Sequence, residues 1–367
     1  RSMGIDIPVI LGGAALNDKF VNEFCRVNYD GPVFYCKDAF EGIEAMSRIE
    51  AGDFNTDFGR PVIDEEIVQL KEKKRKIIPF EEINMPISAN PIPTPPFWGR
   101  RELKADLKSI AYEWINHKLL FSRAWGYSGK GMSKEEKQKQ RDDVLWPLYE
   151  RLKRDIEKMD LFDPTIIYGY YPCRSEQNKL HILDESRGYF SENDVNREFL
   201  HVDDITHTLD FPRQGRKPYR CLSDYLSSDR DDVVAFTCVS AGAKFSEYEQ
   251  KLYVEGNFKE YHLIHGLSIE LAEGLAEVVH KQIRLDLGIA GKEKHALKDV
   301  QMARYTGCRY SFGYPACPEL SDSKVIFDLL KPEEFGIELS ETFQIHPEQS
   351  TTAIVMHNSK ALYFNVD

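Results

Sequence analysis

The run RYSFGYPACPEL, from Arg309 to Leu320, decides which fold we expect for this chain of 367 residues. It places a permanently charged guanidinium, that of Arg309, four residues before a Gly-Tyr-Pro-Ala-Cys turn. An arginine can hold a carboxylate through two parallel hydrogen bonds. Gly313 lets a ligand approach the backbone, and Tyr314 offers a flat ring and a hydroxyl group. These residue types together suit a small ligand with an amino-acid end and an aromatic base. The alternative is a Gly-Pro turn beside a surface arginine.

The composition is that of a soluble globular protein, with 42% hydrophobic and 29% charged residues. The length predicts two or three domains. Acidic residues outnumber basic ones by 60 to 48, and the net charge of −12 argues against nonspecific binding of nucleic acid. No apolar run reaches the length of a membrane span. The chain enters a strand-like run at once, which predicts a fragment of a longer protein.

The seven cysteines are scattered without Cys-x-x-Cys pairs, and no secretion signal precedes them. We therefore expect reduced thiols in a cytoplasmic protein, with no metal site.

The first 50 residues alternate between strand-like and helix-like patterns. The apolar run 7–11 predicts a buried strand, and a helix at 17–27, a strand at 32–36 and a helix through residues 43–49 follow. This alternation predicts the parallel, doubly wound α/β arrangement, in which ligands bind at the carboxyl ends of the strands. Gly12, Gly13 and Ala39 lie at those ends. The alternative for the glycines is a turn that only lets the strand meet its helix.

A proline-rich stretch separates this part from the rest. The sequence NMPISANPIPTPP at 85–97 has neither a helical nor a strand period and predicts an extended linker. The basic run at 71–76 is typical of a solvated helix face. We place the domain borders accordingly: a partial α/β domain at 1–52, a linker at 53–97 and a second domain at 98–367.

The second domain combines long amphipathic helices with paired strands. Apolar spacing predicts helices at 102–115, 135–159 and 259–287. Strand patterns occupy 165–173 and its hairpin partner 179–184, then 231–240, and a strand–turn–strand unit at 353–366. Helices grouped around strands that hairpins connect favour an α+β fold, with a mainly antiparallel sheet.

The run at 309–320 resembles the signature of the activation domain of cobalamin-dependent methionine synthase. Further blocks resemble that family in the same order, namely LFSRAWGY (120–127), YGYYPCRSE (168–176), FPRQ (211–214), IHGLSIELAEGLAEVVH (264–280) and HPEQSTTAIV (346–355). The N-terminal IPVILGGA, NYDGPVFY and KDA resemble the end of the cobalamin-binding domain of the same enzyme. The resemblance implies an α+β activation domain preceded by the C-terminal portion of an α/β doubly wound domain.

The resemblance also implies a site for S-adenosylmethionine. Arg309 would pair with the carboxylate of this ligand, and such a pair contributes about 1.5–3 kcal/mol. The backbone at Ser311 and the turn at Gly313 and Tyr314 would line the adenosine side. No catalytic acid or base is expected, because the sulfonium is already an activated leaving group and the protein has only to position it.

Two further parts of this site follow from the same resemblance. Tyr363 and Phe364 match a pair of aromatic residues that contacts the ligand, although packing at a strand end is the alternative. Asn116 stands where many members carry an aspartate that receives the ligand's amino group. An asparagine can accept a hydrogen bond but lacks the charge, which weakens ammonium recognition by about 1 kcal/mol. Asp106, Glu113 or another acid could replace it.

For cobalamin, the resemblance implies only a partial site. The turn at Gly12, Gly13 and Ala14 would lie along the nucleotide tail of the cofactor, and the backbone near Ala39 would contact the same tail. Bare backbone suits this role because side chains would block a large group. The family's Asp-x-His-x-x-Gly motif, which supplies the lower axial ligand, does not occur in this sequence.

The function implied is part of a methyltransferase, 5-methyltetrahydrofolate–homocysteine S-methyltransferase. This region would bind S-adenosylmethionine and support the reductive methylation of oxidised cobalamin. Its partners would be the homocysteine, folate and cobalamin modules upstream and a flavodoxin-like or ferredoxin-type electron donor. A second hypothesis is a non-catalytic S-adenosylmethionine-binding module that only restrains the cobalamin domain. A third is a stand-alone methyltransferase for another substrate, which the missing glycine-rich loop of that class disfavours.

Overall fold

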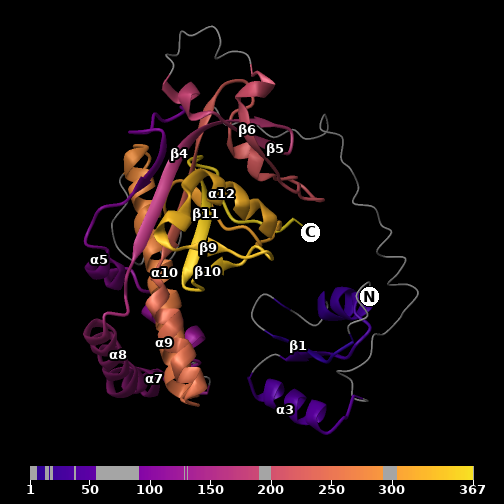
Figure 1. Cartoon of the computed structure of the whole chain (residues 1–367), viewed down its shortest axis with the longest axis vertical. Helices are drawn as coiled ribbons and strands as arrows, with labels where there is room; N and C mark the ends of the chain where they lie inside the picture. The colour runs from indigo at the N-terminus through magenta and orange to yellow at the C-terminus, as the bar shows by residue number, and fades with distance from the viewer. Residues whose placement is uncertain are drawn as a thin grey trace. The chain divides into compact units, whose positions relative to one another are not determined.

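A computed structural model describes residues 6–12, 16, 20–36, 39–54, 91–127, 129, 131–189, 200–291 and 304–366. The chain divides into two compact units, Arg1–Ile78 and Pro79–Asp367 (Figure 1). Most of the predicted linker lies outside the described residues, so the domain borders at residues 52 and 97 stay predictions.

The first unit is a small α/β arrangement. Strand β1 (Val9–Gly12) pairs in parallel with β2 (Val33–Cys36). The chain between them includes a π-helical turn η1 (Val21–Cys25) and the short helix α2 (Arg26–Asn28), and helix α3 (Ala39–Glu50) follows β2. Phe34, Cys36 and Ala45 form the buried core of this unit. The predicted order of strand, helix, strand and helix is confirmed.

The second unit is built on a seven-stranded sheet in which every paired strand runs antiparallel to its neighbour. The order is β6-β5-β4-β7-β11-β8, with β3 also paired to β4. The strands are β3 (Gly99–Glu102), β4 (Thr165–Glu176), β5 (Lys179–Leu183), β6 (Ile205–Asp210), β7 (Asp232–Ser240), β8 (Cys308–Tyr310) and β11 (Ser350–Met356), and β9 (Glu338–Leu339) with β10 (Ile345–His346) forms a separate pair. The predicted β4–β5 hairpin is confirmed.

Helices cover both faces of this sheet. The α-helices are α5 (Leu107–Glu113), α6 (His117–Leu119), α7 (Lys134–Gln140), α8 (Trp146–Met159), α9 (Ala243–Val254), α10 (Phe258–Asp286) and α12 (Ser323–Leu330). The π-helical turns are η3 (Leu120–Ala124) and η4 (Arg141–Leu145), and the 3₁₀ turns are η5 (Glu185–Tyr189), η7 (Val202–Asp204), η8 (Leu222–Tyr225), η9 (Leu320–Asp322) and η10 (Pro332–Phe335). The predicted helices at 135–159 and 259–287 are confirmed, the first as α7, η4 and α8 in succession and the second as α10.

Strand β7 shows how the core is divided, because its side chains alternate between the two faces. Val239 belongs to the core that includes Leu271 of α10. Phe236 belongs to the core on the other face, which includes Ile326 of α12. All nine residues of β7 are buried, as expected for a central strand that is covered on both sides. The result is an α+β domain of three layers, with α10 along one face of the sheet and α12 on the other (Figure 1).

Two sequence-based predictions were wrong in detail. The helix expected at 102–115 is shorter, because 99–102 joins the sheet as β3 and α5 begins only after Asp106, whose side chain caps the helix by accepting a hydrogen bond from the Ser109 nitrogen at 3.3 Å. The second strand expected within 353–366 does not form. Strand β11 already pairs with β7 on one side and β8 on the other, so residues 361–366 find no free strand edge there.

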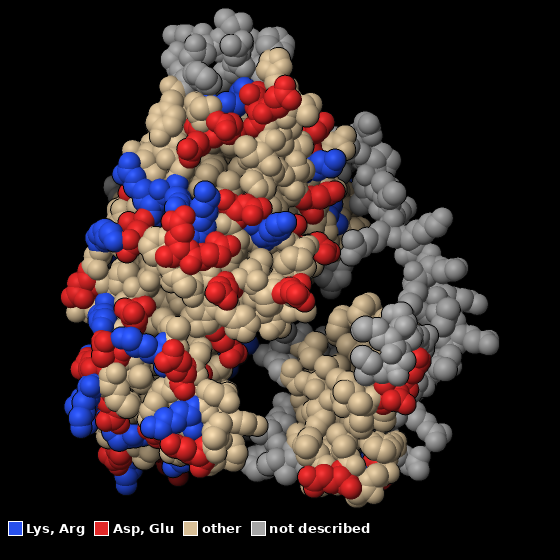
Figure 2. Space-filling model, in the orientation of Figure 1, with Lys and Arg blue, Asp and Glu red and all other residues tan. Residues whose placement is uncertain are grey.

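The second unit carries charges of both signs on the face that Figure 2 shows, where acidic and basic side chains intermingle. Within the described residues, none of the helices combines the length and the apolar character that a membrane crossing requires.

Candidate ligand-binding site

A cavity of about 600 Å³ opens beside β8, in the second unit. Its walls come from three parts of the chain: α10, the strand β8 with the turn after it, and the extended C-terminal segment. The lining residues are Glu273, Arg309, Tyr310, Ser311, Tyr314, Pro315, Ala316, Tyr363, Phe364 and Asn365. The structure therefore brings together predicted site residues from two separate stretches of the sequence, namely Arg309, Ser311 and Tyr314 with Tyr363 and Phe364.

Arg309 is the fixed positive charge of this cavity. Its side chain is 15% exposed, and its Nη2 atom donates to Glu273 Oε2 and Glu277 Oε1, each at 3.0 Å. The two glutamates lie four residues apart on α10 and so share one face of that helix. Burial alone would lower the pKa of Arg309, but the carboxylates of Glu277 and Glu273 outweigh it and raise the pKa above its ordinary value. The guanidinium is therefore charged at any working pH.

Part of this guanidinium has no hydrogen-bond acceptor. The Nε atom of Arg309 is buried, and it has no partner among the described residues. A buried donor without a partner costs about 1–3 kcal/mol. A ligand carboxylate in the cavity would face a cation that the protein already holds in position.

The turn after β8 depends on Gly313. Its φ angle is +92°, and a Cβ atom added there would lie 2.8 Å from Cδ2 of Leu320. The Gly313 nitrogen donates to the Cys317 carbonyl at 2.9 Å, and the Cys317 nitrogen donates to the Tyr314 carbonyl at 2.9 Å. Both the backbone angle and the space explain why a glycine stands here. This tight turn leaves Tyr314 67% exposed at the cavity.

The opposite wall is aromatic. Tyr363 and Phe364 line it, and the ring of Tyr363 meets that of buried Tyr310 edge to face at 5.5 Å. The hydroxyl of Tyr310 donates to the Leu362 carbonyl at 2.9 Å. Tyr363 keeps 58% of its surface exposed, which disagrees with core packing as the alternative for it. Phe364 is half-buried and packs against the core on the α12 face of the sheet, so the alternative describes it in part.

Asn116 lies outside this cavity's lining. It caps α6, where its Oδ1 accepts from the Leu119 nitrogen at 3.2 Å. Its backbone also hydrogen-bonds the carboxyl group of Glu270 on α10. Neither Asp106 nor Glu113 lines the cavity. Glu273 does line it, and sequence reasoning did not single out this residue. A signal was present, since Glu273 and Glu277 lie one turn apart within the matching block ELAEGLAE.

Glu270 lies one turn before Glu273 on α10 and has an unusual acidity. Burial, and next the charge of Glu273, raise its pKa to about 7, although Arg123 and the hydrogen bond from the Asn116 backbone oppose the shift. Its carboxyl group is therefore half protonated near neutral pH. Glu273, which accepts from Arg309 at 3.0 Å, lines the cavity, whereas Glu270 does not.

We expect Glu270 to make stability depend on pH. Between about pH 4.5 and 7, the folded protein keeps a proton that the unfolded chain releases, so the free energy of unfolding falls as the pH rises through this window. The variant Glu270→Gln stays neutral and should exceed the parent in stability at pH 8 by about 2 kcal/mol, after allowance for solvent screening. The difference should shrink towards pH 4.5. Urea denaturation at pH 5 and pH 8 measures it.

The control for this experiment is Glu247→Gln, at an exposed position on α9. It should change stability equally little at both pH values. If the stability of the parent and of the Glu270→Gln variant depended on pH in the same way, the raised pKa of Glu270 would be contradicted.

The predicted cobalamin contacts fall in the first unit. Gly12 ends β1, and an added Cβ would lie 3.2 Å from the carbonyl oxygen of Cys36 on the paired strand. The close approach of the paired strand therefore favours a glycine at this position. Gly13 and Ala14 lie outside the described residues, and Ala39 is the first residue of α3.

Comparison with known proteins gives a consistent picture. A family model described as "Vitamin B12 dependent methionine synthase, activation domain" matches residues 106–367. Methionine synthase of Mycobacterium leprae is 30% identical over 409 residues, and that of Mycobacterium tuberculosis is 31% identical over 405 residues. Each match covers 100% of this chain but 32% of the relative. The chain thus spans about a third of the length of these curated relatives.

A solved structure has the same fold. The crystal structure of the MetH reactivation domain bound to AdoHcy superposes with a TM-score of 0.62 at 21% sequence identity. The match covers 76% of this chain and 84% of that one. At this identity the likeness supports the α+β fold and no more.

Proposed function

Because this chain belongs to the family of the vitamin B12-dependent methionine synthase activation domain, we propose that its cavity binds S-adenosylmethionine and supports the reductive methylation of oxidised cobalamin. The observation that carries this proposal is the arrangement at Arg309. The charged guanidinium of Arg309, held by two glutamates, lines a cavity that has an aromatic wall. The reactivation domain of the same fold was crystallised with AdoHcy, the demethylated form of this ligand.

The lining residues fit both ends of such a ligand. Arg309 would bind the carboxylate through its guanidinium group, and Glu273 would receive the ammonium group, the role first expected of Asn116. The faces of Tyr314 and Tyr363 would hold the adenosine, with the backbone of Ser311 beside it. A volume of about 600 Å³ is within the usual range for small-molecule sites.

The chemistry asks little of the protein beyond placement. S-adenosylmethionine supplies a methyl group that its sulfonium already activates. The residues of this cavity bind the two ends of the ligand and fix its orientation, and none of them has to accept or donate a proton. The set of arginine, glutamate, aromatic rings and backbone is consistent with this task.

The wider setting belongs to the same proposal. The chain would be part of 5-methyltetrahydrofolate–homocysteine S-methyltransferase, with homocysteine, folate and cobalamin modules upstream and a flavodoxin-like or ferredoxin-type electron donor. Gly12, Gly13, Ala14 and Ala39 would border the cobalamin. Because the close approach of the paired strand already favours a glycine at Gly12, we derive no step of the reaction from this unit.

The first test measures ligand recognition by calorimetry with AdoHcy. Glu273→Gln should weaken binding about tenfold, as loss of a charge-assisted hydrogen bond implies. It should not weaken binding of an AdoHcy analogue that lacks the amino group. Glu277→Gln is the matched control, since Glu277 also bonds Arg309 but does not line the cavity. This control should change the affinity less than threefold. Equal losses in both variants would remove Glu273 from the ammonium site.

The second test separates the catalytic role from mere binding. The full-length protein with oxidised cobalamin, a chemical reductant and S-adenosylmethionine should form methylcobalamin, followed by its absorption spectrum. If the ligand binds but the cobalamin is never methylated, the non-catalytic module is the better description.

A further inference from the structure

The aromatic wall of the cavity is held by a loop that does not touch the cavity. From this geometry we propose that Gln214, in the matching block FPRQ, is a positioning residue that fixes residues 361–366 and so places Tyr363 and Phe364 against the ligand. The ligand in question is that of the proposed function, on which this inference rests.

The segment 361–366 needs such an anchor because it belongs to no strand. A strand in a sheet is held by a ladder of backbone bonds, whereas this segment relies on individual contacts. The hydroxyl of Tyr310 holds the Leu362 carbonyl at 2.9 Å. The Nε2 atom of Gln214 donates to the Asn365 carbonyl at 2.6 Å, and the Gly215 nitrogen to the Val366 carbonyl at 3.4 Å. Asn365 itself lines the cavity, so the bond from Gln214 reaches the wall directly.

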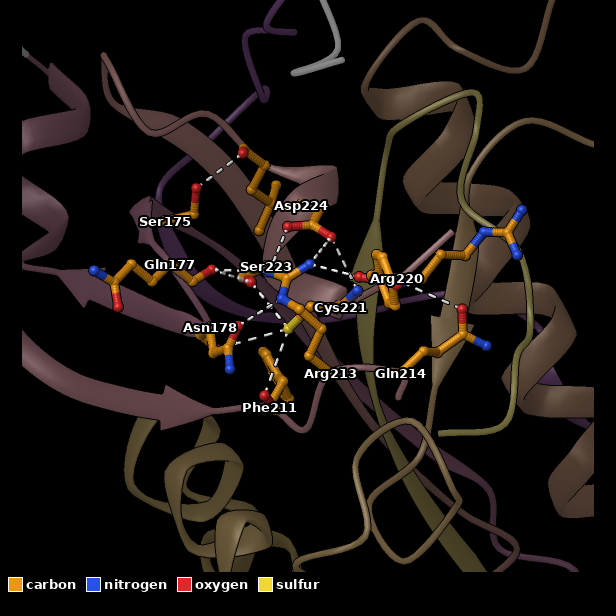
Figure 3. Close-up of polar contacts among 12 residues, drawn as sticks. Ser175, Gln177, Asn178, Phe211, Arg213, Gln214, Arg220, Cys221, Ser223 and Asp224 are labelled. Carbon is orange, nitrogen blue, oxygen red and sulfur yellow. Dashed lines mark hydrogen bonds and ion pairs between the residues drawn. The ribbon is translucent and has the colours of Figure 1, made fainter. Parts of the chain in front are cut away.

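Gln214 is itself held in place. Its residue surface is 6% exposed, and its Oε1 accepts from the Arg220 nitrogen at 3.2 Å (Figure 3). Its own backbone nitrogen donates to the Arg220 carbonyl at 2.9 Å. The two ends of the amide thus have separate tasks. The oxygen closes the loop, and the nitrogen reaches across to Asn365.

The preceding residue makes this loop rigid. Arg213 forms a forked pair with Asp224, with Nη1–Oδ2 at 2.6 Å and Nη2–Oδ1 at 2.7 Å. Its Nε donates to Asn178 Oδ1 at 2.8 Å, and Nη1 also donates to the Tyr219 carbonyl at 2.7 Å (Figure 3). Asp224 in turn accepts from the Cys221 nitrogen at 2.9 Å. Such a network presents Gln214 in one orientation before any ligand arrives.

Loss of this anchor should weaken ligand binding without removing any ligand contact. Without the bond from Gln214, residues 361–366 would move more freely in the unbound protein. Ligand binding would then have to order them, and the loss of conformational entropy would lower the affinity. We expect Gln214→Ala to weaken AdoHcy binding about tenfold. Gln214→Glu should do the same, because it keeps an acceptor for the Arg220 nitrogen but loses the donor to Asn365.

Gln349→Ala is the matched control for this experiment. Gln349 is 0% exposed, and its amide also bridges two elements, donating to Glu249 Oε2 at 2.8 Å and accepting from Ser246 Oγ at 2.7 Å. It does not line the cavity. This variant should lower the melting temperature while the affinity for AdoHcy stays within twofold of the parent.

Hydrogen exchange gives a readout that a general loss of stability would not reproduce. Amides of 361–366 should exchange faster in Gln214→Ala than in the parent and in Gln349→Ala, and AdoHcy should restore part of the protection. Parental affinity in both Gln214 variants, or an equal loss of affinity in Gln349→Ala, would overturn the positioning role. If the parent itself binds no AdoHcy, the proposed function fails. If amides of 361–366 exchange equally fast in the ligand-free parent and the ligand-free Gln214 variants, Gln214 does not anchor this segment, whether or not the ligand binds.

Discussion

Replacing Arg309 by alanine is expected to weaken the binding of AdoHcy and S-adenosylmethionine about 10- to 100-fold. The variant loses a charge-assisted hydrogen bond to the ligand carboxylate, which contributes about 1.5–3 kcal/mol in a partly buried site. It also leaves Glu273 and Glu277 near one another without their shared cation, so the cavity would repel a carboxylate. Isothermal titration calorimetry measures the affinity, and circular dichroism checks that the fold is retained.

A conservative variant separates the two causes. Arg309→Lys keeps a positive charge between the glutamates but loses the planar fork and its Nε donor. We expect a smaller loss of affinity than in the alanine variant, because repulsion from Glu273 and Glu277 stays neutralised. An unchanged affinity in Arg309→Ala, with the fold intact, would remove Arg309 from the site.

The largest effect on stability is expected at Asp231. Its side chain is 1% exposed and accepts from two buried arginines, Arg174 Nη2 at 2.5 Å and Arg187 Nη2 at 2.8 Å. Arg187 Nε adds a third bond at 3.0 Å. The variant Asp231→Asn keeps the volume but removes a charge that both guanidinium groups share, although Arg187 also donates from Nη1 to Asp204 Oδ2 at 2.7 Å. Breaking a buried ion pair from one side typically costs 3–5 kcal/mol, and we expect the free energy of unfolding in urea to fall by about that amount.

An exposed ion pair supplies the comparison. Asp155 pairs with Arg151 at 3.1 Å, and both side chains are more than 40% exposed. Asp155→Asn should change stability by about 0.5 kcal/mol or less, since water already solvates both charges. If Asp231→Asn were no more harmful than this control, other groups would have to balance the two arginines.

The fold could be predicted in outline because local sequence patterns indicated most of its long helices and strands. The apolar stripe of α10 has the period of a helix, and the short runs of β4 and β5, rich in β-branched, aromatic and aliphatic residues, are typical of strands. Strand β3 was missed because its sequence, GRRE, has no strand pattern. Arg100 fixes this strand instead through distant groups, donating to the Leu330 carbonyl at 2.9 Å and to Glu334 at 2.6 Å. Contacts across 230 residues leave no local trace in a sequence.

The candidate site was likewise predictable only in part. The turn at 309–320 was recognisable because its residues are adjacent in sequence and each has a distinct chemical property. Glu273 was missed although it lies in a matching block, because a charged residue on an amphipathic helix usually faces solvent. Asn116 was assigned by position in a motif, whereas the space around α6 directs its side chain to cap a helix. Which acid faces the cavity is a property of the packing between α10 and β8.

Residues 361–366 belong to no strand, and this also makes the cavity suitable for redesign. Tyr363 and Asn365 are both exposed and hold no central place in the sheet, so a mutant library at these two positions should leave the melting temperature within about 2 °C of the parent. Under the proposed function this wall holds the adenosine, so donors that carry a larger group on that end need extra room here, and this strip can supply it at little cost to folding. Protein engineers who want such reagents accepted would therefore begin at the tail of the domain and leave its helices untouched.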